Sequence, residues 1–146
     1  MTENSQVVDL NFEVAYRDIQ VGDEIVRLKL SDEVRTNFAF DIKEAFGKIE
    51  KLSQTEKDFK NQTREEAKAQ TEQLKSYMRE AYDGSLGEGT FDRVYEAAGQ
   101  STPNCLQFMA VCLDIIHEFD QKVAKDVQTR KANKYLKNKR AQQKSK

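Results

Sequence analysis

The stretch PNCLQFMAVCLDIIHEFDQKV, residues 103–123, is the most apolar segment of the chain. Its apolar side chains recur at steps of three and four, which places them on one face of an α-helix. The main stripe consists of Leu106, Met109, Ala110, Leu113, Ile116 and Val123. Ser101 or Thr102 is a suitable cap, and Pro103 suits the first turn because a proline there loses no intrahelical hydrogen bond. We therefore expect a core helix over about residues 103–129.

A charged helical region precedes this core helix. Ser31, followed by two acidic residues, is a typical helix start. Apolar residues then recur at helical steps as far as Leu52, and they thin out beyond it. No glycine or proline lies between residues 53 and 83. The region over about residues 32–83 is therefore either one very long helix or two helices hinged near residues 53–55.

The glycine-rich stretch GSLGEGT, residues 84–90, links the helical region to the C-terminal part of the chain. The order of its residues differs from the dinucleotide fingerprint, from a P-loop and from an EF-hand loop. We interpret it as a tight connector between helices. Thr90 is a suitable cap for a short helix over about residues 91–98, which Gly99 ends.

Two stretches near the start of the sequence alternate apolar and polar residues. The apolar positions are Leu10, Phe12, Val14 and Tyr16 in the first stretch, and Val26, Leu28 and Leu30 in the second. This period of two is typical of half-buried strands. A turn over residues 20–23 joins them into a β-hairpin over about residues 9–30. An isolated hairpin is marginal in water, so its apolar face must rest on a helix or on another subunit.

The composition supports a helical class. Of 146 residues, 34% are charged and 38% are hydrophobic, and there are only six glycines and one proline. We therefore predict a mainly helical α+β fold with a small core. It would comprise an N-terminal β-hairpin packed on an amphipathic helix, a long polar helix, a short helix and an apolar C-terminal helix. Residues 1–129 would form a single domain, and residues 130–146 a basic flexible tail.

Charge is unevenly distributed along the chain. Residues 130–146 contain eight lysines and arginines and no acidic residue, out of 24 basic and 25 acidic residues in all. The remaining 16 bases and 25 acids give residues 1–129 a net charge of −9. The basic end is either a solvated terminus or a contact for something anionic, such as nucleic acid or an acidic protein face.

Few residues are candidates for chemistry. His117 is the only histidine, and no nucleophile or oriented partner lies within its reach in the sequence. Cys105 and Cys112 would lie about 10.5 Å apart along a helix, too far for a disulfide, and there is no Cys-x-x-Cys pair. They are typical of small core residues in a reducing cytosol. We expect no enzyme activity, no cofactor and no metal.

The opening residues and the hydropathy indicate a compartment. The start, MTENSQ, has neither the basic nor the apolar region of a secretory signal. No apolar run approaches the roughly 18–20 residues that a membrane span needs. We expect no membrane association and a cytoplasmic location.

The stretch GEGTFDRVY, residues 87–95, resembles a segment of the tail assembly chaperones of long-tailed phages and prophages of Gram-positive bacteria. In that family a Gly-Glu-Gly-Thr turn leads into a short helix ending in an aromatic residue, here Tyr95. A loop, an apolar helix and a lysine-rich end come next, as they do here from Pro103 onward. The family often has Phe before the turn, where this chain has Leu86.

This resemblance implies a non-enzymatic chaperone that acts in the host cytoplasm. Such proteins bind the tape measure protein, keep it soluble and help recruit tail tube subunits, so both are expected partners, together with further copies of this chain. We expect contacts through Leu10, Phe12, Val14, Val26 and Leu28. The alternatives are a small nucleic-acid-binding protein acting through its basic end, which the negative charge of residues 1–129 disfavours, and a permanent structural component of the tail.

Overall fold

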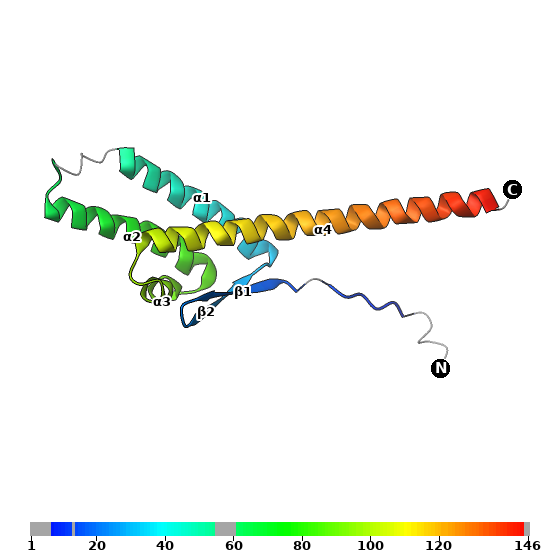
Figure 1. Cartoon of the computed structure of the whole chain (residues 1–146), viewed down its shortest axis with the longest axis horizontal. Helices are drawn as coiled ribbons and strands as arrows, with labels where there is room; N and C mark the ends of the chain where they lie inside the picture. Colours follow the sequence, from blue (N-terminus) through cyan, green and yellow to red (C-terminus); the bar gives the residue numbers. More distant parts are fainter. Residues whose placement is uncertain (1–6, 13, 55–60, 145–146) are drawn as a thin grey trace.

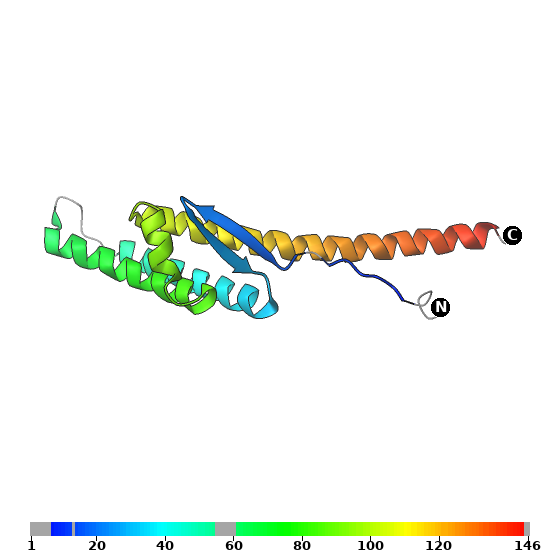
Figure 2. The same cartoon turned by 90° about the horizontal axis from the view of Figure 1, so that it is seen from below.

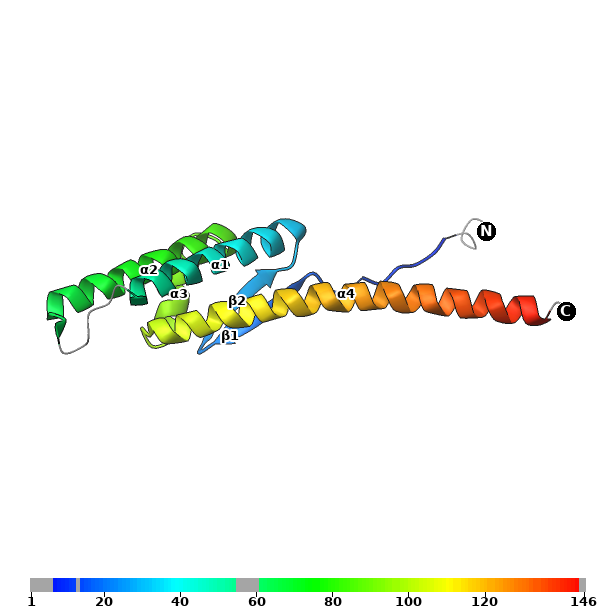
Figure 3. The same ribbon diagram turned by 90° about the horizontal axis from the view of Figure 1, so that it is seen from above.

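The computed structural model of the chain describes residues 7–12, 14–54 and 61–144. Within these residues a two-stranded antiparallel sheet precedes four helices, which confirms the predicted mainly helical α+β fold (Figure 1). The elements are β1 (Tyr16–Val21), β2 (Glu24–Lys29), α1 (Asp32–Gln54), α2 (Arg64–Leu86), α3 (Thr90–Ala97) and α4 (Thr102–Lys144). Seen from above, α1 and α2 form one layer and α4 a second layer packed against it, with β2 running from beside α4 toward the start of α1 (Figure 3).

The β-hairpin lies further along the chain than the alternating pattern predicted. β1 and β2 pair around the turn Gly22–Asp23, and the pairing ends where Tyr16 lies opposite Lys29. One further hydrogen bond of 2.8 Å runs from the Leu30 amide to the Ala15 carbonyl, and the chain then enters α1 at Asp32, so the residues before Ala15 face no partner strand. The predicted first strand was therefore wrong in position: in the part of residues 7–15 that the structure describes, the chain forms no strand.

The helical region before residue 84 is a pair of antiparallel helices, α1 and α2, which was one of the two predicted alternatives (Figures 1 and 2). α1 ends at Gln54, within the predicted hinge at 53–55, the rest of which lies outside the described residues. Thr63 caps α2, and its hydroxyl oxygen accepts a hydrogen bond of 3.1 Å from the Glu66 amide. The spacing Thr-x-x-Glu from Thr63 to Glu66 is a known helix-start signal, so the start of this second helix is also marked in the sequence.

The connection between α2 and α3 is tight because each helix end is capped by a side chain of the other helix. The Asp83 carboxylate in α2 accepts a hydrogen bond of 3.0 Å from the Phe91 amide at the start of α3. The Thr90 hydroxyl donates to the Gly87 carbonyl, 2.7 Å away. Thr90 is thus the first residue of α3, so the prediction that it caps this helix was wrong, and the capping carboxylate comes from Asp83.

The core is centred on Tyr82 of α2. Its ring packs edge-on against Phe91 at a centroid distance of 5.3 Å and lies 5.3 Å from Phe108 of α4. Its hydroxyl donates a hydrogen bond of 2.5 Å to the Cys105 carbonyl, the kind of partner that a buried phenol requires. Other fully buried side chains are Leu28, Leu30, Phe38, Ile42, Met78, Val94, Met109, Cys112 and Ile116. These residues hold the hairpin, α1, α2, α3 and the first part of α4 together.

α4 is much longer than predicted. Ser101 caps it, accepting a hydrogen bond of 3.3 Å from the Asn104 amide, and the helix continues to Lys144. The expected helix end near residue 129 was wrong, because residues 130–144, which were predicted to form a basic tail, continue the helix. The second part of α4 extends beyond the rest of the fold (Figure 1). We call residues 102–119 the inner half of α4 and residues 120–144 its outer half.

Candidate interaction surface

An open apolar groove lies between the start of the chain and the outer half of α4. We call the described residues 7–12, 14 and 15 the arm, and this feature the arm groove. Figures 1 and 2 show the arm leaving the hairpin beside α4 and running toward the same end of the molecule as the C-terminal end of that helix. The groove has a volume of about 740 Å³. Its lining residues are Leu10, Asn11, Phe12, Val14, Phe119, Val123, Asp126, Val127 and Arg130.

The apolar side chains that line the arm groove are largely exposed to solvent. Phe12 is 84% exposed, and Val123 and Val127 of α4 are 40% and 48% exposed. Single exposed apolar residues are normal on a protein surface, and Phe40 on α1 is an example. A contiguous set that lines a concave surface is characteristic of a binding site for another protein.

The floor of the groove continues the face of α4 that is buried in the core. Cys112 and Ile116 are buried in the inner half, and Phe119 is half-buried where the helix leaves the fold. Val123 and Val127 come next at steps of four, so they lie on the same side of the helix. The outer half of α4 thus presents an apolar face similar to the one that is buried in the core. Among the described residues, only those of the arm lie beside this face.

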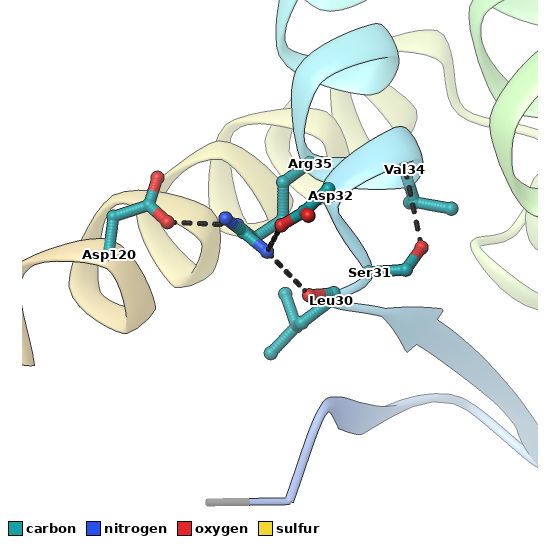
Figure 4. Close-up of polar contacts among 6 residues, drawn as sticks. All are labelled: Leu30, Ser31, Asp32, Val34, Arg35 and Asp120. Carbon is teal, nitrogen blue, oxygen red and sulfur yellow. Dashed lines mark hydrogen bonds and ion pairs between the residues drawn. The ribbon is translucent and has the colours of Figure 1, made fainter. Parts of the chain in front are cut away.

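Arg35 fixes the direction in which α4 leaves the fold (Figure 4). Its Nε donates to Asp120 of α4 at 2.8 Å, and its Nη1 donates to the Leu30 carbonyl at 2.8 Å and to Asp32 at 3.1 Å. The guanidinium carbon also lies 5.3 Å from the centre of the Phe119 ring. A planar guanidinium can hold several acceptors in a fixed geometry, so Arg35 ties the junction of β2 and α1 to the base of the groove.

The outer half of α4 becomes strongly basic toward its C-terminal end. Residues 120–129 contain two acidic and two basic residues, whereas from Arg130 to Lys144 there are seven bases and no acidic residue. The far end of the groove floor is therefore basic, while the corner at the start of α1 carries the exposed acids Asp32 and Glu33. A ligand of this groove would combine apolar side chains with negative charge.

The five predicted contact residues divide into two groups. Leu10, Phe12 and Val14 are exposed and line the arm groove, although on an extended segment and not on a strand. Val26 and Leu28 are 3% and 0% exposed, so the prediction that they form contacts at the surface was wrong. They pack into the core because the apolar face of β2 is covered by the helices.

The residues that α4 contributes to the arm groove were not predicted from the sequence. Val123 had been assigned to the core stripe, and Val127 had not been considered. The sequence periodicity places Ile116, Val123 and Val127 on one helix face, but it does not show where along this face the cover of the fold ends.

The residues considered for chemistry lie apart from one another. His117 is exposed on α4, whereas Cys105 and Cys112 are buried and free. Burial raises the pKa of the Cys112 thiol to about 12 and also raises the pKa of Cys105, so neither is a reactive thiolate at neutral pH. Among the described residues, no group of three or more His, Cys, Asp or Glu side chains is arranged to hold a metal ion.

Comparisons of the chain with protein-family models, with curated proteins and with solved structures find no match. In the part of the chain that the structure describes, no helix combines the length and the apolar character needed to cross a bilayer.

Proposed function

We propose that this protein is a non-enzymatic tail assembly chaperone of a long-tailed phage or prophage, which binds the tape measure protein through the arm groove. The observation that carries the proposal is the exposed apolar surface shared by the arm and the outer half of α4. The resemblance of residues 87–95 to the chaperone family points to the class of client. The chaperone would act in the host cytoplasm and help recruit tail tube subunits to the bound client.

The groove suits a client that is long, helical and poorly soluble alone. Apolar side chains from an amphipathic helix would lie against Phe12, Val123 and Val127, and acidic side chains of the client would face Arg130. Each contact is small, so a long client would be held by many copies of the chain, and the combined binding would be much tighter than any single contact.

Co-expression of the chain with the tape measure protein of the same phage or prophage tests the proposal. We expect the intact chain to raise the soluble yield of the tape measure protein and to co-purify with it. Phe12→Ser and Val127→Asp should abolish both effects. Phe40→Ser is the matched control, because Phe40 is 68% exposed but lies outside the groove. An equal loss in all three variants, or no gain with the intact chain, would contradict the proposal.

The helical structure of the basic end is also compatible with a second function. A helix with seven bases between residues 130 and 144 is suited to contacts with phosphates, as in a small nucleic-acid-binding protein. Such binding would weaken steeply with salt and would be lost on removal of residues 130–146. It would be unaffected by Phe12→Ser, which separates it from binding in the groove. Peptide mapping of purified particles separates an assembly chaperone from a permanent tail component.

A further inference from the structure

The two edges of the β-hairpin have different surroundings. The edge of β2 lies against α3, where the Ile25 carbonyl accepts a hydrogen bond of 3.4 Å from Arg93. β1 lies on the other side of β2, away from α1 and α2 (Figures 2 and 3). Among the described elements, only β2 packs extensively against β1. A two-stranded sheet with one uncovered edge can accept a further strand there.

The pairing within the hairpin decides which main-chain groups point outward from β1. The Leu30 amide donates to the Ala15 carbonyl, and hydrogen-bonded pairs recur at every second residue of an antiparallel ladder. The residues of β1 that bond to β2 are therefore Arg17, Ile19 and Val21. The N–H and C=O groups of Asp18 and Gln20 point away from β2, and no other group of the described residues bonds to them.

The charged side chains of β1 leave most of this edge unprotected. Charges that point outward along an edge strand commonly prevent another strand from adding. The Asp18 carboxylate instead accepts hydrogen bonds of 2.9 and 3.2 Å from Arg27 on β2. The Arg17 guanidinium turns back and donates to the carbonyls of Tyr16 at 2.9 Å and Val14 at 3.2 Å. It therefore covers the edge only where β1 begins.

An open groove of about 370 Å³ runs along β1, and we call it the edge groove. Its apolar lining comes mainly from Ile19 and Val21 of β1 and from Phe108 and Val111 of α4. No residue of β2 lines it, so it lies on the open side of β1. None of its lining residues is charged, although 34% of the residues of the chain are. It shares no lining residue with the arm groove.

We propose that an extended segment of another protein binds here as a third strand, antiparallel to β1, with alternate side chains in the edge groove. Residues of the segment opposite Asp18 and Gln20 exchange main-chain hydrogen bonds with them and point their side chains toward solvent. Residues opposite Ile19 and Val21 point into the groove, where the absence of charged partners requires them to be apolar. A helix does not fit this site, because its own main-chain groups are already bonded within it.

This site goes beyond the proposed function, because it is a separate surface for a partner with a different backbone conformation. A helical client in the arm groove and a strand on β1 can be bound at the same time. The test below uses only the chain and a peptide, so its failure would leave the chaperone proposal standing. A chain that binds the peptide but does not keep the tape measure protein soluble would contradict only the chaperone proposal.

The probe is a short peptide with blocked ends in which valine alternates with threonine, titrated into isotope-labelled chain and followed by nuclear magnetic resonance. The amide signals of Asp18 and Gln20 should shift, and their exchange with solvent should slow. Val111→Lys should weaken binding about tenfold or more, because it places a charge in the groove. Ala110→Lys is the matched control, since Ala110 is exposed on the same helix outside the groove. No binding at about 1 mM peptide, or equal weakening by both substitutions, would overturn the proposal.

Methylation of the peptide amides distinguishes a third strand from a purely apolar contact, because a methylated nitrogen cannot donate. In the antiparallel arrangement the threonine amides donate to β1 and the valine amides point away from it. Methylation of the threonine amides should therefore abolish binding, and methylation of the valine amides should leave it unchanged. The reverse result, or equal binding by both peptides, would overturn the proposal. Strong protection of the Asp18 and Gln20 amides before the peptide is added would also overturn it, because another part of the chain would then occupy the edge.

Discussion

The two halves of α4 belong to one continuous helix and one helix face, yet they have opposite environments. In the inner half, Cys105, Met109, Cys112 and Ile116 are buried where α4 packs against α1, α2 and α3. In the outer half, Val123 and Val127 continue the same face in the open. The apolar pattern is the same in both halves, but other elements of the fold cover only the inner half. An apolar stripe longer than the fold beneath it is available to bind a partner.

The largest expected difference between the core and the arm groove is in the free energy of unfolding that is lost when an aromatic side chain is truncated. Tyr82→Ala removes the ring at the centre of the core and its hydrogen bond to Cys105, and should lower the free energy of unfolding by about 3–5 kcal/mol. Phe12→Ala in the groove should change it by less than about 0.5 kcal/mol. Urea denaturation followed by circular dichroism measures both. Similar losses would show that the arm is part of the core.

Arg35→Met tests the junction between the two regions. It keeps much of the packing but removes hydrogen bonds to Asp120, to Asp32 and to the Leu30 carbonyl, so we expect a loss of about 1–2 kcal/mol. Lys48→Met is the matched control. Its longer and more exposed ion pairs should contribute less than about 0.5 kcal/mol. If the two variants lose equally little, Arg35 does not fix the base of the groove.

The helix cap that Asp83 provides for α3 is expected to contribute less to the stability of the fold. Asp83→Ala leaves the Phe91 amide without its acceptor and should cost about 1 kcal/mol in thermal or chemical unfolding. Asp83→Asn retains an acceptor oxygen and should recover most of this loss. Equal destabilisation in both variants would mean that the carboxylate acts through its charge and not through the cap.

The smallest effect is a dependence on pH at the surface of the hairpin. The hydrogen bond from Arg27 lowers the pKa of Asp18 below its ordinary value. The pair therefore stabilises the fold at pH values above the ordinary pKa of an aspartate, and this contribution disappears as the pH falls through the lowered value. Asp18→Asn should reduce the loss of stability on acidification slightly. An unchanged acid profile would show that the exposed pair contributes nothing.

Local periodicity was sufficient to predict the fold class and the helix over the inner half of α4. It did not give the buried face in full, because Ala110 of the predicted stripe is exposed, whereas Cys105 and Cys112 are fully buried. The hairpin was placed too early because the alternation runs on before Tyr16 without a partner strand. Counting residues on each side of the turn Gly22–Asp23 would have corrected this, since β2 has only six residues before α1 begins.

The groove was harder to predict, because it depends on where a helix extends beyond its support. Nothing local distinguishes Ile116, which is buried, from Val123, which is exposed. The distinction follows from the tertiary position of Arg35 and Asp120 at the exit of α4, 85 residues apart in sequence. Leu10, Phe12 and Val14 were predicted as contacts because their alternation suggested the apolar face of a strand, and the structure exposes them on the arm instead.

Hydrogen exchange along α4, measured with and without the tape measure protein, is the decisive comparison. In the chain alone at low concentration, amides over residues 106–116 should exchange only through global unfolding, and those over 121–134 should exchange faster by orders of magnitude. Addition of the tape measure protein should slow exchange over residues 121–134 and in the arm, and leave 106–116 unchanged. Equal protection of both halves in the chain alone, or no slowing when the client is added, would contradict the open groove as the site of binding.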